Sequence, residues 1–361
     1  MIYETQLPAV RRDSFDSIKG LACIGVVFIH VLFPEPLKIP VKCMSRFSVP
    51  VFFLTSGFFF AEGGVNCQPE KITKKIRHIM MLILNAAFFF TIFMFIFKPH
   101  EISNWSPMPY LKERATAGKL AKLFITNEPL AFGHMWFLLA LFYIYLFSLC
   151  FFADNKRLRY SGWIGVFLLF GYVMLQEFAD VTQKMRLHTG VQIPESNETL
   201  YFCNLFLFRA LPFFLIGISL RKNEKRIQEW KLPRTLFLFL FISFVVISAW
   251  EWTLTNNYTQ YYVSSIFAAL TLLIFAIKWS WRPHFLYFIG SKLSLYIYIF
   301  HIPVQKSLDI FFRKRHLSSS PFIVWTMPIM VLTVTILFSI FFLLTRNLIN
   351  KARLFLKEVK R

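Results

Sequence analysis

Ten apolar segments divide the chain, and they limit the folds that are open to it. They cover residues 14–33, 45–61, 77–97, 131–152, 161–178, 202–220, 235–252, 260–278, 285–304 and 322–345. A helix of about 20 apolar residues is long enough to cross the hydrocarbon core of a bilayer. The segments therefore predict an all-α integral membrane protein with about ten transmembrane helices.

The remaining sequence leaves no room for a large soluble domain. Hydrophobic residues make up 56% of the chain and charged residues only 16%, whereas soluble domains carry about 25% charge. The long connections are confined to roughly 98–130 and 179–201. We predict a single membrane domain over residues 1–361, with a polar start at 1–13 and a tail at about 346–361.

The basic residues predict how the helices are oriented. If the N-terminus is cytoplasmic, 25 of the 40 Lys and Arg residues lie on the cytoplasmic side and 14 on the other side. Cytoplasmic loops of membrane proteins are enriched in these residues, so the bias places both termini in the cytoplasm. It also accounts for the net charge of +21 without a nucleic-acid partner. The first segment ends at Pro34 without a small-residue cleavage site, so we expect a retained helix and not a signal peptide.

Several common kinds of site have no sequence support. The five cysteines (Cys23, Cys43, Cys67, Cys150 and Cys203) form no CxxC pair and show no metal-ligand spacing, so we predict neither a disulfide nor a metal. The sequence also lacks the P-loop, dinucleotide-binding and HExxH motifs.

Three histidines lie inside apolar segments at a similar depth. His30 is close to the outer end of the first segment, His134 to the outer start of the fourth and His301 to the outer end of the ninth. A single histidine at such a depth would be interpreted as a structural residue bonded to a neighbouring helix. Three at one depth favour a shared polar cavity.

The first segment joins charges near one membrane surface to His30. Lys19 precedes His30 by eleven residues, so both lie on one helix face with a rise of about 16 Å between them. The apolar run is short, and the helix must begin near Ser14, which draws Asp16 and Lys19 toward the membrane. This pair is either an interfacial ion pair with a snorkelling lysine or the charged entrance to a cavity that ends at His30.

Two further sets of cations have a structural and a functional interpretation. Arg46, at the outer end of the second segment, and Arg209, inside the sixth, either make packing contacts or bind a polar acceptor. Lys74, Lys75 and Arg77 precede the third segment. They are either a positive-inside anchor or a site for the diphosphate of a coenzyme.

Five motifs give the chain a resemblance to a known family. They are Asp16-x-x-Lys19-Gly20 ahead of His30, the stretch from Ser45 to Gly57, His134-Met-Trp-Phe-Leu138, Phe213-Phe-Leu-Ile-Gly217, and Ser294-Leu-Tyr-Ile-Tyr-Ile-Phe-His301. In this order and spacing, they resemble acyltransferase family 3, the multi-pass bacterial membrane O-acyltransferases. The resemblance covers nearly the whole chain and is closest to the short type, which has no fused extracellular domain.

The resemblance implies an activity and roles for particular residues. It implies transfer of an acyl group, usually acetyl from acetyl-CoA, to a hydroxyl of a cell-surface or lipid-linked polysaccharide at the bacterial cytoplasmic membrane. His30 matches the motif histidine, and Lys19 stands where the family more often has Arg. The run from Lys74 to Arg77 corresponds to a basic motif that contacts coenzyme A.

Several alternatives stay open at this point. His30 acts either as a general base or as a carrier of the acyl group, with Asp16 and Lys19 on the same helix. His134 or Arg209 supplies the oxyanion donor. Arg46, Arg209 and His301 are candidates for acceptor binding. The other candidate functions are a transporter or flippase for a lipid-linked saccharide, and a family member that uses another donor such as succinyl-CoA.

Overall fold

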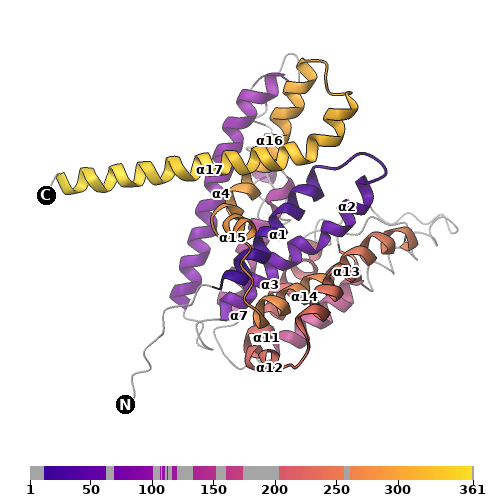
Figure 1. Ribbon diagram of the computed structural model, residues 1–361. Helices are drawn as coiled ribbons and strands as arrows, with labels where there is room; N and C mark the ends of the chain where they lie inside the picture. Colours follow the sequence, from indigo (N-terminus) through magenta and orange to yellow (C-terminus); the bar gives the residue numbers. More distant parts are fainter. Residues whose placement is uncertain are drawn as a thin grey trace.

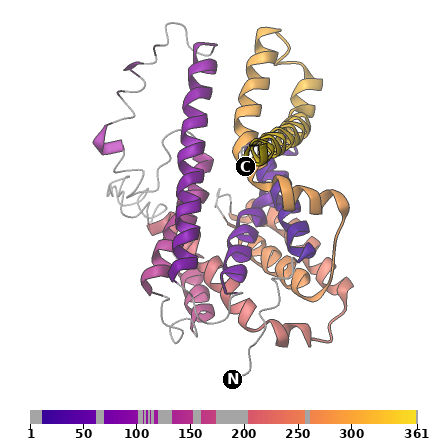
Figure 2. The same cartoon turned by 90° about the vertical axis from the view of Figure 1, so that its left-hand side faces the viewer.

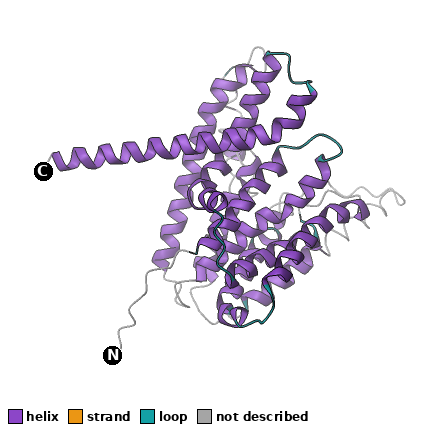
Figure 3. Ribbon diagram, in the orientation of Figure 1, coloured by secondary structure: helices purple, strands orange, loops and turns teal. Residues whose placement is uncertain are grey.

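The computed structural model describes residues 12–61, 69–100, 133–151, 160–173, 203–255 and 261–359, with a few short pieces between 106 and 119. Within these ranges the chain is helical and contains no strand (Figure 3). The longer elements are α1 (Asp13–His30), α2 (Lys38–Met44), α3 (Ser48–Phe60), α4 (Pro69–Phe97), α7 (Trp136–Phe151), α11 (Leu211–Lys222), α13 (Arg234–Thr255), α14 (Val263–Lys278), α16 (Ser294–Lys314) and α17 (Pro321–Val359). The all-α prediction is confirmed for this part of the chain.

Six helical stretches are long and apolar enough to cross a membrane. They are Lys38–Phe60, Pro69–Phe97, Gly133–Cys150, Arg234–Thr253, His284–Lys314 and Pro321–Ala352. Two further apolar helices, Ser161–Val173 and Val263–Lys278, are shorter. Each of the ten predicted segments contains helix in its described part. The number of ten crossings and the cytoplasmic placement of both termini remain predictions.

Helix α1 lies inside the bundle and contacts many of the other elements (Figure 1). It packs on α3, α14, α16, the short helix α15 (His284–Phe288) and the π-helical turn η6 (Ile289–Leu293). Phe15, Ile18, Ala22 and Val27 on α1 are fully buried. The burial of these apolar side chains fixes the rotation of α1 about its own axis, and with it the directions in which its polar side chains point.

The outer helices form a second layer around α1. Figure 2 shows α4 beside α16, and the rings of Phe89 and Phe300 join them with centroids 5.2 Å apart. Helix α17 packs on α16 and α1, and its C-terminal part projects away from the other helices (Figure 1). Many large apolar side chains of α4, α13 and α17 are exposed, as expected for surfaces that face lipid.

Two motif glycines allow α3 and α11 to touch through their backbones. A Cβ atom on Gly57 would collide with the backbone oxygen of Phe214, and one on Gly217 would collide with that of Leu54. Gly20 on α1 makes the same kind of contact with the backbone of Leu286 in α15, and Gly290 in η6 makes it with the backbone of Asp16 in α1. Small residues at helix contacts in membranes permit such close approach, which explains why the motifs need glycine at these positions.

Substituting one of these glycines is expected to destabilise the bundle. A methyl group at Gly217 must push the α3 backbone away, so Gly217→Ala should cost about 1–3 kcal/mol of stability. The measurement is thermal unfolding of the protein in detergent. Gly118→Ala is the matched control, because a Cβ at Gly118 meets nothing within 4 Å. Equal melting temperatures for the two variants would contradict the prediction.

Proline determines where two of the helices differ from the predicted segments. Helix α1 ends at His30 and not at residue 33, because Pro34 has no N–H to donate to the His30 carbonyl and its ring would clash there. Helix α16 continues past Pro303 to Lys314, whereas the predicted segment ends at residue 304. Membrane helices tolerate an internal proline when neighbouring helices and side chains compensate for the missing bond. His301 therefore lies within a long helix and not near its end.

Candidate active site

The three intramembrane histidines come together from three helices. The ring centroids of His134 and His301 are 5.0 Å apart, those of His30 and His301 are 5.2 Å apart, and those of His30 and His134 are 6.2 Å apart. His30 is the last residue of α1, His134 lies in the turn Gly133–Met135 that leads into α7, and His301 lies on α16. We refer to these three side chains as the histidine cluster.

The members of the histidine cluster differ in their exposure. His301 is completely buried and His134 is 4% exposed, whereas His30 is only partly buried. A reacting group must be reached by its substrates, so His30 is the member best placed to react. The other two are placed to act on His30.

One hydrogen bond determines the tautomer of His301. Its Nδ1 lies 2.9 Å from the backbone oxygen of Ile297. A carbonyl oxygen only accepts, so Nδ1 carries the proton and donates it, and Nε2 of the neutral ring is left with a lone pair. Nε2 is buried and makes no hydrogen bond to the residues that the structure describes. His301 therefore holds a buried proton acceptor beside His30 and His134.

Tyr298 is a site residue that the sequence analysis missed. Its hydroxyl donates to the backbone oxygen of His134 at 2.6 Å, and the two rings lie 5.5 Å apart. Phe90 packs on His134 from α4, with centroids 5.6 Å apart. Tyr298 is three residues before His301, so both project from one face of α16. That spacing is the signal that could have identified it.

Cations lie beside the His30 end of α1. Lys42 on α2 and Arg46 in the 3-10 turn Ser45–Phe47 are within electrostatic range of the His30 ring. Arg46 is 9% exposed. Pro50 has no N–H to donate to the Arg46 carbonyl, so the α-helical hydrogen-bond pattern is interrupted there. The chain forms the tighter 3-10 turn at Arg46, between α2 and α3. Lys42 was missed by the sequence analysis, although its spacing of four residues from Arg46 is typical of one helix face.

Arg209 joins this end of the bundle through tyrosines. It follows the π-helical turn Cys203–Phe208, before α11 begins. Its guanidinium donates to the hydroxyl of Tyr172, and the rings of Tyr172 and Tyr261 lie 6.1 Å apart. Both tyrosines are 3% exposed. Arg209 therefore lies in the break between the π-helical turn and α11, where the Tyr172 hydroxyl is its polar neighbour.

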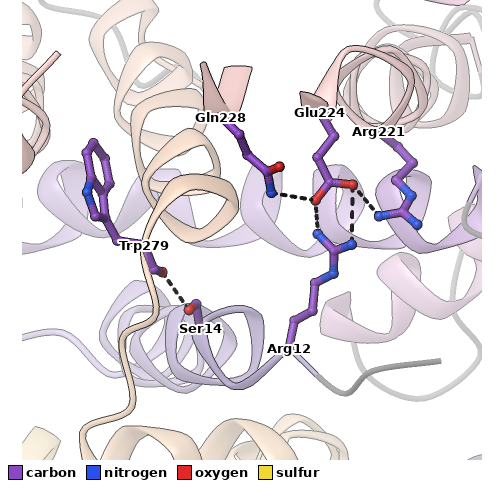
Figure 4. A network of polar contacts seen from close by, with 6 residues as sticks. All are labelled: Arg12, Ser14, Arg221, Glu224, Gln228 and Trp279. Carbon is purple, nitrogen blue, oxygen red and sulfur yellow. Dashed lines mark hydrogen bonds and ion pairs between the residues drawn. The ribbon is translucent and has the colours of Figure 1, made fainter. Parts of the chain in front are cut away.

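The other end of α1 carries a separate polar network (Figure 4). Glu224 accepts hydrogen bonds from Arg12 and Arg221, and both guanidinium groups also stack on Phe58 at 5.4 and 5.3 Å. Ser14 donates to the backbone oxygen of Trp279 at 2.8 Å. These residues were not proposed from sequence, because contacts such as Arg12–Glu224 join positions 212 residues apart.

Asp16 and Lys19 form the predicted ion pair, with a Lys19 Nζ to Asp16 Oδ1 distance of 2.6 Å. Asp16 is 7% exposed and Lys19 is partly buried, so the pair lies at the edge of the bundle. Lys19 stands about 16 Å and Asp16 about 21 Å along α1 from His30. The structure thus does not bring Asp16 and Lys19 into the histidine cluster.

The three candidate cations of α4 do not share one environment. The ammonium group of Lys75 lies over the rings of Phe60 and Tyr145, at 5.6 and 5.3 Å. Lys74 and Arg77 are exposed. Lys75 therefore faces α3 and α7, and the other two project away from the bundle.

The fold and the histidine cluster define a helical membrane protein with a buried polar site between its helices. The family model for the acyltransferase domain, acyltransferase family 3, matches residues 12–344. The chain therefore belongs to acyltransferase family 3 and is a membrane acyltransferase. Searches of curated proteins and of solved structures found no match. Membership of this family favours acyl transfer over the transporter or flippase alternative.

Proposed function

We propose that this membrane acyltransferase moves an acetyl group from acetyl-CoA to a hydroxyl of a cell-surface or lipid-linked polysaccharide at the bacterial cytoplasmic membrane. The observation that carries the proposal is that His30 is partly exposed and that the buried rings of His134 and His301 lie next to it. A hydroxyl is a weak nucleophile at neutral pH, and a positioned imidazole is the usual group to activate it. The basic residues at the far end of α1 fit a donor that arrives from the cytoplasm.

In the first mechanism, His30 is a general base. Its ring nitrogen takes the proton of the acceptor hydroxyl while the hydroxyl oxygen attacks the thioester carbon. The carbon–sulfur bond then breaks, and the imidazolium returns the proton to the departing thiolate. His134 is buried 6.2 Å from His30, centroid to centroid, and is the proposed donor to the oxyanion. Arg209 belongs to the tyrosine group and is better placed to hold the acceptor.

In the second mechanism, His30 carries the acyl group itself. Its nitrogen attacks the thioester and releases coenzyme A as the thiol, and the acceptor hydroxyl then displaces the acyl group from the ring. Only the second mechanism forms a covalent intermediate, so the presence of that intermediate distinguishes the two. An acetyl-histidine at position 30 would be detected by rapid quench and mass spectrometry with acetyl-CoA alone.

The function is tested with purified protein, labelled acetyl-CoA and de-esterified envelope glycan. The expected result is transfer of the label to the glycan as an alkali-labile ester, with release of one thiol for each ester formed. Succinyl-CoA is supplied in a parallel reaction, because mass spectrometry distinguishes the two esters. Exclusive use of succinyl-CoA would replace the proposed donor, and transfer from neither thioester would overturn the proposal.

Lys75 is proposed as a contact for coenzyme A, because it faces the bundle. Lys75→Gln removes one cation from the path of a polyanionic donor, so the KM for acetyl-CoA should rise about tenfold with little change in kcat. Lys74→Gln, on the exposed side of the same helix turn, is the matched control. An equal rise of KM in both variants would assign donor binding to the whole basic run and not to Lys75.

A further inference from the structure

The hydroxyl of Tyr298 lies within the first turn of α7. It donates to the backbone oxygen of His134 at 2.6 Å, and the backbone N–H of Leu138 donates to the same hydroxyl. His134 and Leu138 are four residues apart, and a carbonyl and an N–H at this spacing bond directly to each other in a regular α-helix. The Tyr298 hydroxyl therefore joins two backbone groups that would otherwise be partners.

The backbone at the start of α7 has the form that such an insertion produces. The regular helix begins at Trp136, and Gly133–Met135 form a 3-10 turn ahead of it. A side chain that enters the hydrogen-bond ladder of a helix disrupts its regular geometry, and 3-10 turns are frequent at helix ends. The position of His134 thus depends on a side chain from another helix and not only on the local sequence.

The ring of Tyr298 has contacts that do not depend on its hydroxyl. Its centroid lies 5.5 Å from that of His134 and 5.6 Å from that of Phe137. Tyr298 precedes His301 by three residues on α16, so one face of this helix carries both side chains. The His301 ring lies 5.0 Å from that of His134, centroid to centroid. Helix α16 therefore contacts His134 at two points, its backbone oxygen and its ring.

Phenylalanine at position 298 would keep these ring contacts and lose the insertion. The His134 carbonyl and the Leu138 N–H would then bond directly, which would extend the α-helix and rotate residue 134. The imidazole would move with the backbone, and a displacement of about 1 Å in a catalytic group lowers a rate about 100-fold. A single hydroxyl group thus separates two arrangements of the histidine cluster.

We propose that Tyr298 is a positioning residue that holds His134 beside His30 and His301. The inference rests on the proposed function, in which His134 donates to the oxyanion, and it adds a role for a residue that acts through the His134 backbone. Tyr298 itself takes no proton and contacts no reacting atom in this role. Its effect on the reaction is therefore on kcat and not on the binding of acetyl-CoA.

The kinetic test uses the purified full-length protein, labelled acetyl-CoA and de-esterified envelope glycan. We expect Tyr298→Phe to lower kcat about 10- to 100-fold and to leave the KM for acetyl-CoA unchanged. Tyr296→Phe is the matched control, because Tyr296 lies two residues earlier on α16 and its hydroxyl accepts from Arg346 at 2.7 Å, outside the histidine cluster. The control should keep the normal kcat. Equal losses of kcat in both variants would overturn the inference.

A spectroscopic measurement separates positioning from packing. In protein with isotope-labelled histidine rings, the NMR signal of His134 is identified by its absence from His134→Gln. This signal should shift in Tyr298→Phe and stay in place in Tyr296→Phe. Replacing Tyr298 by 4-aminophenylalanine keeps a donor to the His134 carbonyl, so it should restore the original signal and most of the lost kcat.

Three results would overturn the inference: an unchanged kcat in Tyr298→Phe, an unmoved His134 signal, or loss of folding in this variant, which would assign the hydroxyl to stability alone. Failure of the proposed function looks different. The unmodified protein would then transfer no acetyl group from acetyl-CoA, and the NMR comparison would still test whether Tyr298 positions His134.

Discussion

Replacing His30 by alanine should abolish acyl transfer while leaving the bundle folded. A general base contributes roughly 10²–10⁴-fold to the rate, and loss of a covalent carrier would reduce transfer further. His30 is partly exposed at the end of α1, so its removal leaves a small gap and not a buried void. The measurements are acetyl transfer to glycan and release of coenzyme A, with thermal unfolding to confirm the fold.

The matched control is another histidine at a helix end. His284 is exposed at the start of α15, outside the histidine cluster, so His284→Ala should transfer acetyl at the normal rate. If His30→Ala kept more than about a tenth of the activity, neither mechanism would be tenable, because both require this ring.

Replacing His301 by phenylalanine should lower kcat and leave the KM for acetyl-CoA unchanged. Phenylalanine keeps a ring of similar size in the buried position but removes the Nε2 acceptor next to His30. A hydrogen bond to a charged group is worth about 1.5–3 kcal/mol, so kcat should fall roughly 10- to 150-fold if Nε2 stabilises protonated His30. His301 is thus proposed as a positioning residue.

A second variant separates this role from simple packing. His301→Gln can place an oxygen acceptor near the position of Nε2, so it should recover part of the lost kcat. A purely structural role predicts the reverse order, because phenylalanine packs in the apolar surroundings better than glutamine. Equal activity of both variants with equal melting temperatures would also contradict the positioning role.

Apolar length and residue spacing were sufficient to predict the helices of this membrane protein and one of its ion pairs. The apolar segments contain helices because a bilayer accepts only backbone that bonds within its own segment or in a closed barrel. The short first segment predicted a helix that starts near Ser14, and α1 begins at Asp13. The Asp16–Lys19 pair also follows from spacing alone.

The effects of proline and glycine could be understood only from the residues that surround each helix. The ninth predicted segment ends at residue 304, just after Pro303, yet α16 continues for eleven residues beyond this proline. The motif glycines Gly57 and Gly217 are 160 residues apart, and their shared role became apparent only when α3 and α11 were placed in contact. A sequence shows that a residue is small, but not what lies against it.

The site depended on the tertiary structure to a greater degree. The sequence alone placed His30, His134 and His301 at one depth on three different helices, with Lys19 near the other end of the first helix and Arg46 at the outer end of the second segment. Only the packing of α1, α7 and α16 decided that the three rings meet, that His30 is the accessible one, and that Lys42 joins Arg46 beside it. The physical reason is that helical periodicity sets the direction of a side chain about its own axis, whereas the neighbour in that direction is chosen by the packing of helices distant in the sequence.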